Sequence, residues 1–473
     1  MTSSVDIRNT EGIEPSEQHW STRSVWSHER LAVAVAAIGV LTASAVPGLG
    51  LAITSGAALL GVAAVLRHQR TTARWCLTAM SLVPWLIVRD NRWLALTIVA
   101  TVALVGTLGA IAGATGRSID DLSFGALTRL NRQRRQPRIR PSGTDMSTGV
   151  VRSVLIGVGI ALPVVMVFYQ LLASADAVFN SWIDPSVLPR VRLISFAVVA
   201  PLSLGVARFG SNGSSDLDGA KRERFGVLES TIVLGAVSAL FAAFIAARLS
   251  TIGQPLENAA LRGEVREGFF QLLWVVALTV VLVLVLRAVS GESVLDPRVR
   301  RIGRLAIILA AVIDVLALMR ISQYIDQTFH TPLRFWSFGF GVWLLAVLAL
   351  AAVRLGSFRS ETRWFTGALV TTWVGFVLVV AIVNPDERIA RHNFENATSS
   401  QVEWVAVNNL ISLSEDATPV IVENIDVLRP MPNARFERMA AHLCAAESDD
   451  YPRGFNLSRR NAGQVVAELC SAD

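Results

Sequence analysis

Long apolar runs recur along this 473-residue chain and constrain its fold more than any other feature. A run of about twenty apolar residues is long enough to cross the hydrocarbon core of a bilayer as an α-helix. Hydrophobic residues make up 52% of the chain and charged residues 17%, which is too apolar a balance for an ordinary soluble protein. We therefore predict an all-α fold, a polytopic transmembrane helical bundle.

The apolar runs and the polar stretches between them divide the chain into five parts. A polar cytoplasmic arm over 1–30 precedes a four-span membrane part over 31–116. A basic cytoplasmic loop over 117–150 leads to a seven-span membrane core over 151–383. A small helical tail outside the membrane occupies 384–473. The sequence thus predicts about eleven spans.

Basic residues indicate which loops face the cytoplasm. Lys221 is the only lysine, and the arginines cluster between the apolar runs. Clusters of this kind favour the cytoplasmic side of a membrane. Because they flank spans, the net charge of +6 points to membrane lipids as partners and to no nucleic acid. An odd number of spans then places the N-terminus in the cytoplasm and the C-terminus outside the plasma membrane.

The tail over 384–473 is acidic although the rest of the chain is basic. It carries eight arginines against fourteen aspartates and glutamates, which supports its export. The sequence Asn-Pro-Asp-Glu at 384–387 predicts a helix start, with a cap residue, proline in the first position and acids in the first turn. In an oxidising location, Cys444 and Cys470 could form a disulfide. An exported tail could also contact other envelope proteins.

The segment from Asp314 to Trp336 places ionisable side chains at the edge of an apolar run. Such groups are costly in hydrocarbon and persist where they face a protein interior or a functional site. The ligand or ion candidates are Asp314, Arg320, Tyr324, Asp326, His330 and Arg334. If the helix continues to Gln327, Arg320 and Tyr324 share one face, whereas Asp314 lies deeper on another.

Each candidate has a functional and a structural interpretation. Asp314 is either a proton, ion or substrate site or a buried carboxyl group that fixes helix packing. Arg320 and Arg334 either hold a lipid phosphate or anchor the hairpin at the membrane interface. Asp326 and His330 suggest a pH switch, but they offer too few ligands for a metal. We therefore predict no metal.

Two acids elsewhere are secondary candidates. Asp176 and Glu267 fall on the same outer side as this segment, so they either approach it or cap and solubilise helix ends. The sequence contains no phosphate-binding glycine loop, no His-Glu-x-x-His motif and no nucleophile elbow. It therefore gives no support for a cofactor or for a catalytic residue, and it favours a function other than catalysis.

Several motifs resemble those of a known family. The motifs are Ser174–Phe179, Arg266–Leu273, Arg320–Arg334, Asn384–Asn393, Leu413–Pro419 and Phe455–Arg459. They resemble a bacterial integral membrane family catalogued as domain of unknown function 4173, with a broader relative numbered 4153. The resemblance covers roughly residue 150 to the C-terminus. It implies many spans and an extramembrane tail, and it supplies no activity, substrate or catalytic residue.

Three functions remain open at this point. The leading hypothesis is a plasma-membrane protein that binds or transports a small molecule, ion or lipid, because polar motifs cluster near the outer membrane face. The first alternative is an envelope-associated scaffold or signalling protein that acts through its exported tail. The second alternative is a lipid-modifying membrane enzyme.

Overall fold

The computed structural model describes most of the chain, and all regular structure in the described residues is helical. The described residues are 47–65, 70–115, 146–176, 179, 226–250, 259–290, 296–327, 329–356, 364–395, 407–428, 433–444 and 454–470. The predicted arm over 1–30, most of the basic loop over 117–150 and residues 180–225 of the predicted seven-span core lie outside them. The all-α prediction is confirmed for the described ranges.

Seven helices of the described part are long and apolar enough to cross a membrane. They are α5 (Arg92–Thr115), α8 (Met146–Ala175), α11 (Val227–Leu249), α12 (Ala259–Ser290), α13 (Pro297–Gln327), α14 (Pro332–Gly356) and α15 (Phe365–Val383). Two shorter apolar stretches, Leu49–Ala64 and Ala73–Val88, fall below the length of a full span. A multi-pass membrane fold is therefore supported, whereas the predicted count of about eleven spans is not confirmed.

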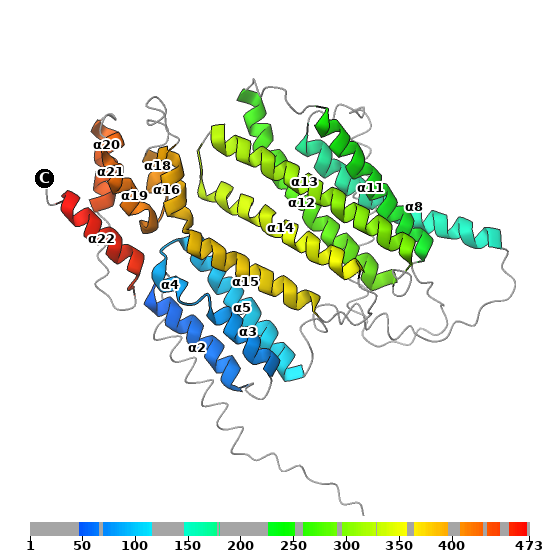
Figure 1. Cartoon of the computed structure of the whole chain (residues 1–473), viewed down its shortest axis with the longest axis horizontal. Helices are drawn as coiled ribbons and strands as arrows, with labels where there is room; N and C mark the ends of the chain where they lie inside the picture. Colours follow the sequence, from blue (N-terminus) through cyan, green and yellow to red (C-terminus); the bar gives the residue numbers. More distant parts are fainter. Residues whose placement is uncertain are drawn as a thin grey trace, which may run out of the picture.

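The membrane helices pack around two separate hydrophobic cores. One core joins α8, α11, α12, α13 and α14, with fully buried Phe241, Phe244 and Phe269 at its centre. The other joins α15 to α5 and to the short helices α2 (Leu49–Val65), α3 (Arg70–Met80) and α4 (Trp85–Val88). Figure 1 shows α15 beside these N-terminal helices and α14 beside α13. Helix α15 thus packs with helices that are far from it in sequence.

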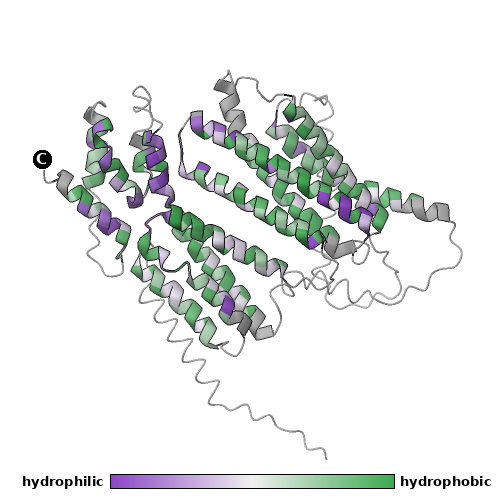
Figure 2. Cartoon of the chain, viewed as in Figure 1, coloured by the Kyte–Doolittle hydropathy of each residue, from purple (hydrophilic) through white to green (hydrophobic). Residues whose placement is uncertain are grey.

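Large apolar side chains remain on the outside of both groups. Leu96, Leu155 and Trp274 are 66%, 67% and 62% exposed. Figure 2 shows hydrophobic residues along the lengths of the long helices and hydrophilic residues concentrated on α16 (Pro385–Glu395). Exposed leucine and tryptophan are favourable in lipid because hydrocarbon chains are as apolar as the side chains themselves.

The last helices form a compact cluster at one end of the membrane helices (Figure 1). After α16, these elements are α18 (Val407–Ile411), η3 (Glu415–Ala417), α19 (Thr418–Glu423), α20 (Ile425–Leu428), α21 (Asn433–Cys444) and α22 (Leu457–Cys470). Ile421, Leu428 and Met439 are among the buried residues of their shared hydrophobic core. A disulfide joins Cys444 to Cys470, with Cα atoms 6.1 Å apart.

Helix α16 begins where the sequence predicts it. Asn384 ends α15 in the left-handed conformation, with φ of 56°, and Pro385 is the first residue of α16. The side-chain amide of Asn384 donates to Oε2 of Glu387 at 2.8 Å. A left-handed residue allows a sharp change of direction, so the chain leaves the last span and enters the tail without an intervening loop.

Candidate functional site

The ends of α8 and α11 meet the side of α13 at Asp176, the residue that follows α8. Its Oδ2 atom lies 2.6 Å from Nη1 of Arg248 and 4.0 Å from Nη1 of Arg320. Its Oδ1 atom accepts a hydrogen bond from the backbone N–H of Phe179 at 3.0 Å. Arg320 also donates to the carbonyl oxygen of Ala175 at 2.9 Å. Asp176 is only 4% exposed and lies beside two guanidinium groups, so this cluster joins the ends of α8 and α11 to α13.

Gly268 lets α12 approach the same cluster. It belongs to the motif Arg266–Leu273, and a Cβ atom at this position would lie 2.4 Å from the carbonyl oxygen of Ala175. The same Cβ atom would lie 3.2 Å from Nη1 of Arg320. Only a residue without a side chain fits such a close approach. The secondary candidate Glu267 precedes this glycine, and its side chain lies outside the described residues.

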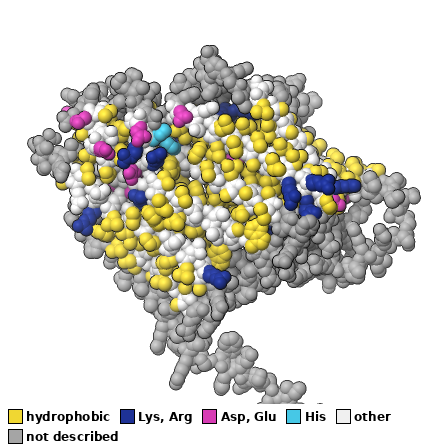
Figure 3. Space-filling view, viewed as in Figure 1, with side chains coloured by type: hydrophobic (Ala, Val, Ile, Leu, Met, Phe, Trp, Pro, Cys, Tyr) yellow, Lys and Arg dark blue, Asp and Glu magenta, His cyan; other side chains and the backbone are white. Residues whose placement is uncertain are grey.

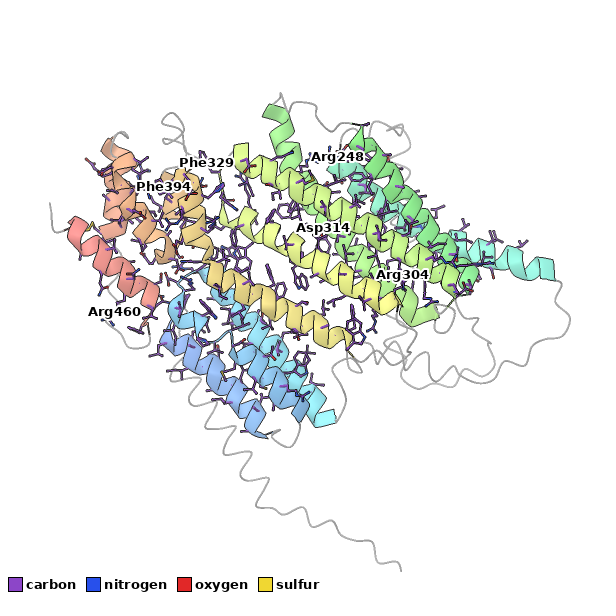
Figure 4. The ribbon with its side chains drawn as sticks, viewed as in Figure 1. Arg248, Arg304, Asp314, Phe329, Phe394 and Arg460 are labelled. Atoms are coloured by element: carbon purple, nitrogen blue, oxygen red, sulfur yellow. A yellow bond between two sulfur atoms is a disulfide. The ribbon has the colours of Figure 1, made fainter. Side chains whose placement is uncertain are left out.

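Asp314 lies near the middle of α13, between the ends of the bundle (Figure 4). It is 0% exposed, and within the described residues neither carboxylate oxygen has a hydrogen-bond partner. Helix α14 passes beside it at Gly341, where a Cβ atom would lie 3.5 Å from Oδ1. An ionised carboxylate without a partner is costly in a membrane interior. This position therefore accommodates an uncharged side chain best.

We expect Asp314→Asn to keep the Tm of the purified protein or to raise it, because asparagine has nearly the same shape and no charge. Asp314→Lys, which introduces a charge at the same buried position, should lower the Tm. Thermal unfolding in detergent compares the three proteins. A clear loss of Tm in Asp314→Asn would contradict this expectation and would show that the charged carboxylate is needed.

Tyr324 and Arg334 lie on either side of the α13–α14 turn and line one pocket. The guanidinium carbon of Arg334 lies 4.4 Å from the centre of the Tyr324 ring, and its Nη2 atom lies 3.2 Å from the phenol oxygen. Its Nη1 atom donates to the carbonyl oxygen of Phe329. The pocket has a volume of about 220 Å³, and Thr331 and Ser337 are its other polar members.

A larger apolar groove lies beside this pocket. It has a volume of about 650 Å³, and its walls come from the membrane helices α5, α12, α14 and α15. Its aromatic lining residues are Phe270, Trp274, Trp336, Phe340, Trp373 and Phe376. Phe270 and Ser337 line both the groove and the smaller pocket. The two cavities are therefore neighbours, one with an arginine and the other largely apolar.

His330 contacts the tail and is not among the residues that line the pocket. Its backbone N–H donates to Oδ1 of Asn393 at 2.7 Å, and the Asn393 amide donates to its carbonyl oxygen at 3.0 Å. The rings of His330 and His392 have centres 5.4 Å apart. Burial, followed by the charge of His392, lowers the pKa of His330 to about 4. Asp326 is exposed near the end of α13.

Three aspartates connect the tail to the membrane helices, and two of them, Asp386 and Asp416, are buried. We call the aspartates and their polar partners the clasp, which comprises Arg89, Asp90, Asn91, Asp386, Ser414, Asp416, Asn456 and Arg459. Oδ2 of Asp416 accepts hydrogen bonds from the backbone N–H groups of Asp90 and Asn91 at 2.9 and 3.1 Å. Oδ2 of Asp386 accepts from the hydroxyl of Ser414 at 2.6 Å, and that hydroxyl also lies 3.2 Å from Asp416.

Arg459 of α22 holds the other side of the clasp. Its Nη2 and Nε atoms each lie 2.8 Å from Oδ1 of Asp90, and both side chains are 13% exposed. It also donates to the carbonyl oxygen of Pro47 at 2.6 Å. Asn456, which is 0% exposed, donates to the carbonyl oxygen of Arg89 at 2.9 Å. The tail is thus joined to the N-terminal helices by buried charge-assisted hydrogen bonds. Figure 3 shows acidic and basic side chains gathered at this end of the molecule.

Burial shifts the protonation of the clasp aspartates. It is the largest cause that raises the pKa of Asp90, to about 6, although the hydrogen bond and charge of Arg459 lower that pKa. Burial also raises the pKa of Asp386 and of Asp416. An acid with a raised pKa binds its proton more tightly in the docked state than in the undocked state. All three groups therefore strengthen the tail contact as the pH falls, and Asp90 does so as the pH falls through about 6.

Sequence reasoning named none of the clasp residues as site residues. The tail half lies in motifs that the family resemblance had already marked, namely Asn384–Asn393, Leu413–Pro419 and Phe455–Arg459. The membrane half, Arg89-Asp90-Asn91, is a short polar stretch between two apolar runs. Two charged residues and an amide in so short a connection indicate a polar contact. Nothing in the sequence indicates that the partner of this contact is the tail.

Within the ranges that the structure describes, no group of three or more His, Cys, Asp or Glu side chains could hold a metal ion. The clasp carboxylates receive their hydrogen bonds from backbone N–H groups, a hydroxyl and arginine. The two neighbouring cavities offer a different chemistry, because the pocket has a guanidinium and a phenol and the groove has aromatic walls. That combination suits a ligand with one polar end and one apolar end.

The sequence profile of the family described as Domain of unknown function (DUF4153) matches residues 54–424. No curated protein and no solved structure matches the chain. The match begins within α2, so it includes N-terminal helices that lay outside the motifs quoted above. The predicted relation to family 4153 agrees with this match, whereas the label 4173 is not confirmed. With most of its length matched, the chain belongs to the family Domain of unknown function (DUF4153).

Proposed function

We propose that this protein binds a membrane lipid, with the hydrocarbon chains in the apolar groove between α5, α12, α14 and α15. The observation that carries the proposal is the meeting of two cavities. The groove of about 650 Å³ shares Phe270 and Ser337 with a pocket that contains Arg334. A lipid has the same division into an apolar and a polar part.

The surroundings of the groove support a lipid more than an ion or a water-soluble molecule. All four walls are helices long and apolar enough to span a membrane, so hydrocarbon surrounds the groove. Ligand sites of this size are mostly apolar, with a few polar groups that fix orientation. The buried carboxylate of Asp176 serves helix contacts, since it lies within ion-pair distance of Arg248 and Arg320.

The proposal includes a location and an orientation. The protein lies in the plasma membrane of a bacterium, with the N-terminus in the cytoplasm and the tail from Asn384 onward on the extracytoplasmic side. The acidic balance of the tail and the Cys444–Cys470 disulfide support export, because disulfides persist in oxidising compartments. A reporter fused after Asp473 should be active only in a form that works outside the cytoplasm. Activity of a cytoplasmic reporter would reverse the orientation.

The scaffold hypothesis has less support. Tail residues that belong to family motifs face the chain's own membrane helices, as Asp416 does with Asp90 and Asn91. This docking makes the tail part of the membrane protein, whereas a scaffold needs those surfaces for partners. Other envelope proteins would then have to contact the outward side of the tail.

Bound lipid, measured by mass spectrometry after purification in mild detergent, tests the proposal. Ala277→Trp places an indole into the groove from α12, and Ala100→Trp does so from α5. Both variants should lose most of the bound lipid and should gain less Tm when lipid is added back. The control is Ala243→Trp on α11, an exposed position away from the groove. Equal lipid in all four proteins would refute the proposal.

A further inference from the structure

We propose that the pocket at the α13–α14 turn binds the phosphate of a phospholipid with a net negative headgroup, and that Arg334 determines this preference. The inference rests on the lipid proposal above and adds the chemical class of the ligand. The pocket would hold the phosphate while the chains occupy the groove that shares its Phe270 and Ser337 walls.

The first support is the geometry of the guanidinium. Arg334 lies 4.4 Å over the ring of Tyr324 and bonds to its phenol oxygen and to the carbonyl of Phe329. These contacts fix a side chain that would otherwise lose much rotamer freedom on binding. A guanidinium has five N–H donors in a planar fork that matches phosphate oxygens. A guanidinium can therefore bond to protein groups and to a phosphate oxygen at the same time.

The second support is the set of polar groups beside the guanidinium. Thr331 and the phenol of Tyr324 line the same pocket, whereas the Ser337 hydroxyl donates to the carbonyl oxygen of Leu333 at 2.6 Å. Hydroxyl groups and arginine are the donors that proteins commonly offer to phosphate. The remaining walls, such as Phe269 and Leu333, are apolar, and Phe269 is only 1% exposed. A charge-assisted hydrogen bond is stronger where water is excluded.

The third support is the local balance of charge. Basic groups from the turn and from α16 lie near His330, since His392, Arg334 and Arg388 all act on its pKa, and Arg334 also lines the pocket. Asp326, at the end of α13, is exposed to solvent, and Glu387 of α16 is paired with Arg391. A headgroup with its own cation, such as ethanolamine or choline, would be repelled by this field. A headgroup with only negative charge is attracted.

The test compares phosphatidylglycerol with phosphatidylethanolamine of identical acyl chains, added to delipidated full-length protein in detergent. The Tm shift at increasing lipid gives the apparent affinity. The wild-type protein should favour phosphatidylglycerol by about tenfold, because both headgroups bring the phosphate but only phosphatidylethanolamine brings an ammonium group close to Arg334. Arg334→Gln should abolish that preference. Diacylglycerol with the same acyl chains has no phosphate and reports binding by the groove alone. It should bind with equally low affinity to the wild-type protein and to Arg334→Gln.

The matched control is Arg391→Gln on α16, which removes the same charge from a side chain that is 41% exposed and paired with Glu387. It should keep the wild-type preference. If the wild-type protein binds the two phospholipids with equal affinity, the inference is wrong. This result needs no variant, so the inference can be tested even if Arg334→Gln folds poorly. Loss of preference in Arg391→Gln would also overturn it, because any surface charge would then suffice.

Glycerol phosphate separates a lipid headgroup from a free phosphate. If it stabilises the protein as well as phosphatidylglycerol does, the ligand is a soluble phosphate compound and the inference is wrong. Failure of the two proposals can be told apart. If Ala277→Trp loses bound lipid and Arg334→Gln keeps the headgroup preference, the groove binds lipid and the pocket assignment fails. If Ala277→Trp keeps its lipid, the proposed function itself fails.

Discussion

Arg459→Met is expected to detach the tail from the membrane helices. The variant keeps the length of the side chain but removes the charge that faces Asp90, and both partners are 13% exposed in the wild type. The carboxylate of Asp90 would then remain buried near Asp416 and Glu415, whose charges already raise its pKa. Removal of one partner from a buried ion pair costs about 3–5 kcal/mol. Hydrogen exchange of α19 and α22 should show loss of protection.

Arg460→Met is the matched control for this variant. Arg460 is the next residue of α22 and is exposed, so its loss should leave exchange in α19 and α22 unchanged. Figure 4 labels it at the edge of the tail. Adding Asp90→Asn to Arg459→Met should restore part of the protection, because it removes the carboxylate that lost its partner. If both arginine variants exchange alike, the Asp90–Arg459 pair does not hold the tail.

Docking of the tail in Arg459→Met should depend on pH more strongly than docking in the wild type. Without the lowering effect of Arg459, the pKa of Asp90 should rise above its present value of about 6. The carboxyl group is then neutral at low pH and no longer needs a partner, so the variant should dock better at pH 5.5 than at pH 8. His330 acts in the opposite direction, because its pKa of about 4 lies below the ordinary value and its protonation below pH 6.5 disfavours docking. Comparison with Arg459→Met/Asp90→Asn isolates the contribution of Asp90.

Some of the fold follows from local sequence. The apolar runs predict the long helices, and the Asn-Pro-Asp-Glu sequence predicts the start of α16 at Pro385. Helix α13 ends at Gln327, so the condition under which Arg320 and Tyr324 would share one helix face is met. These features depend on residues that are near one another in the chain. Length, capping and hydropathy are enough to determine them.

The choice of helix neighbours does not follow from the sequence. Lipid chains and a protein interior are both apolar, so a hydrophobic pattern does not tell which of the two a helix face will meet. For that reason nothing indicated that α15 packs with α2 to α5, or that four helices leave an aromatic groove between them. The predicted division into four and seven spans follows chain order, whereas the hydrophobic cores do not.

The sequence predicted some of the polar site residues, but it did not predict which of them contact one another. Asp176, Arg320, Tyr324 and Arg334 were all named from the sequence, but the structure separates them into a helix-end cluster and a pocket. Arg248 was not named, although it lies closest to Asp176. The contact between Asp90 and Asp416 joins residues 326 positions apart, with no periodic signal to connect them. Such pairs depend on the whole fold.

Gly268→Ala should destabilise the larger group of membrane helices although it adds one methyl group. The new Cβ atom would lie 2.4 Å from the carbonyl oxygen of Ala175, which is backbone and cannot rotate away. Helices α8 and α12 must therefore move apart, and the hydrogen bond from Arg320 to that carbonyl is disturbed with them. Overpacking of this kind costs about 1–3 kcal/mol. A larger residue such as leucine at 268 should prevent correct assembly.

Gly159→Ala on α8 is the control, because a Cβ atom there meets nothing within 4 Å. Alanine is the better helix former, so this variant should keep or raise the Tm of the wild type in detergent. The two substitutions make the same chemical change in a membrane helix, and the difference between their Tm values measures the close approach at Ala175. Equal Tm values would mean that α12 does not approach α8 so closely and that the cluster of Asp176, Arg248 and Arg320 does not set the spacing of these helices.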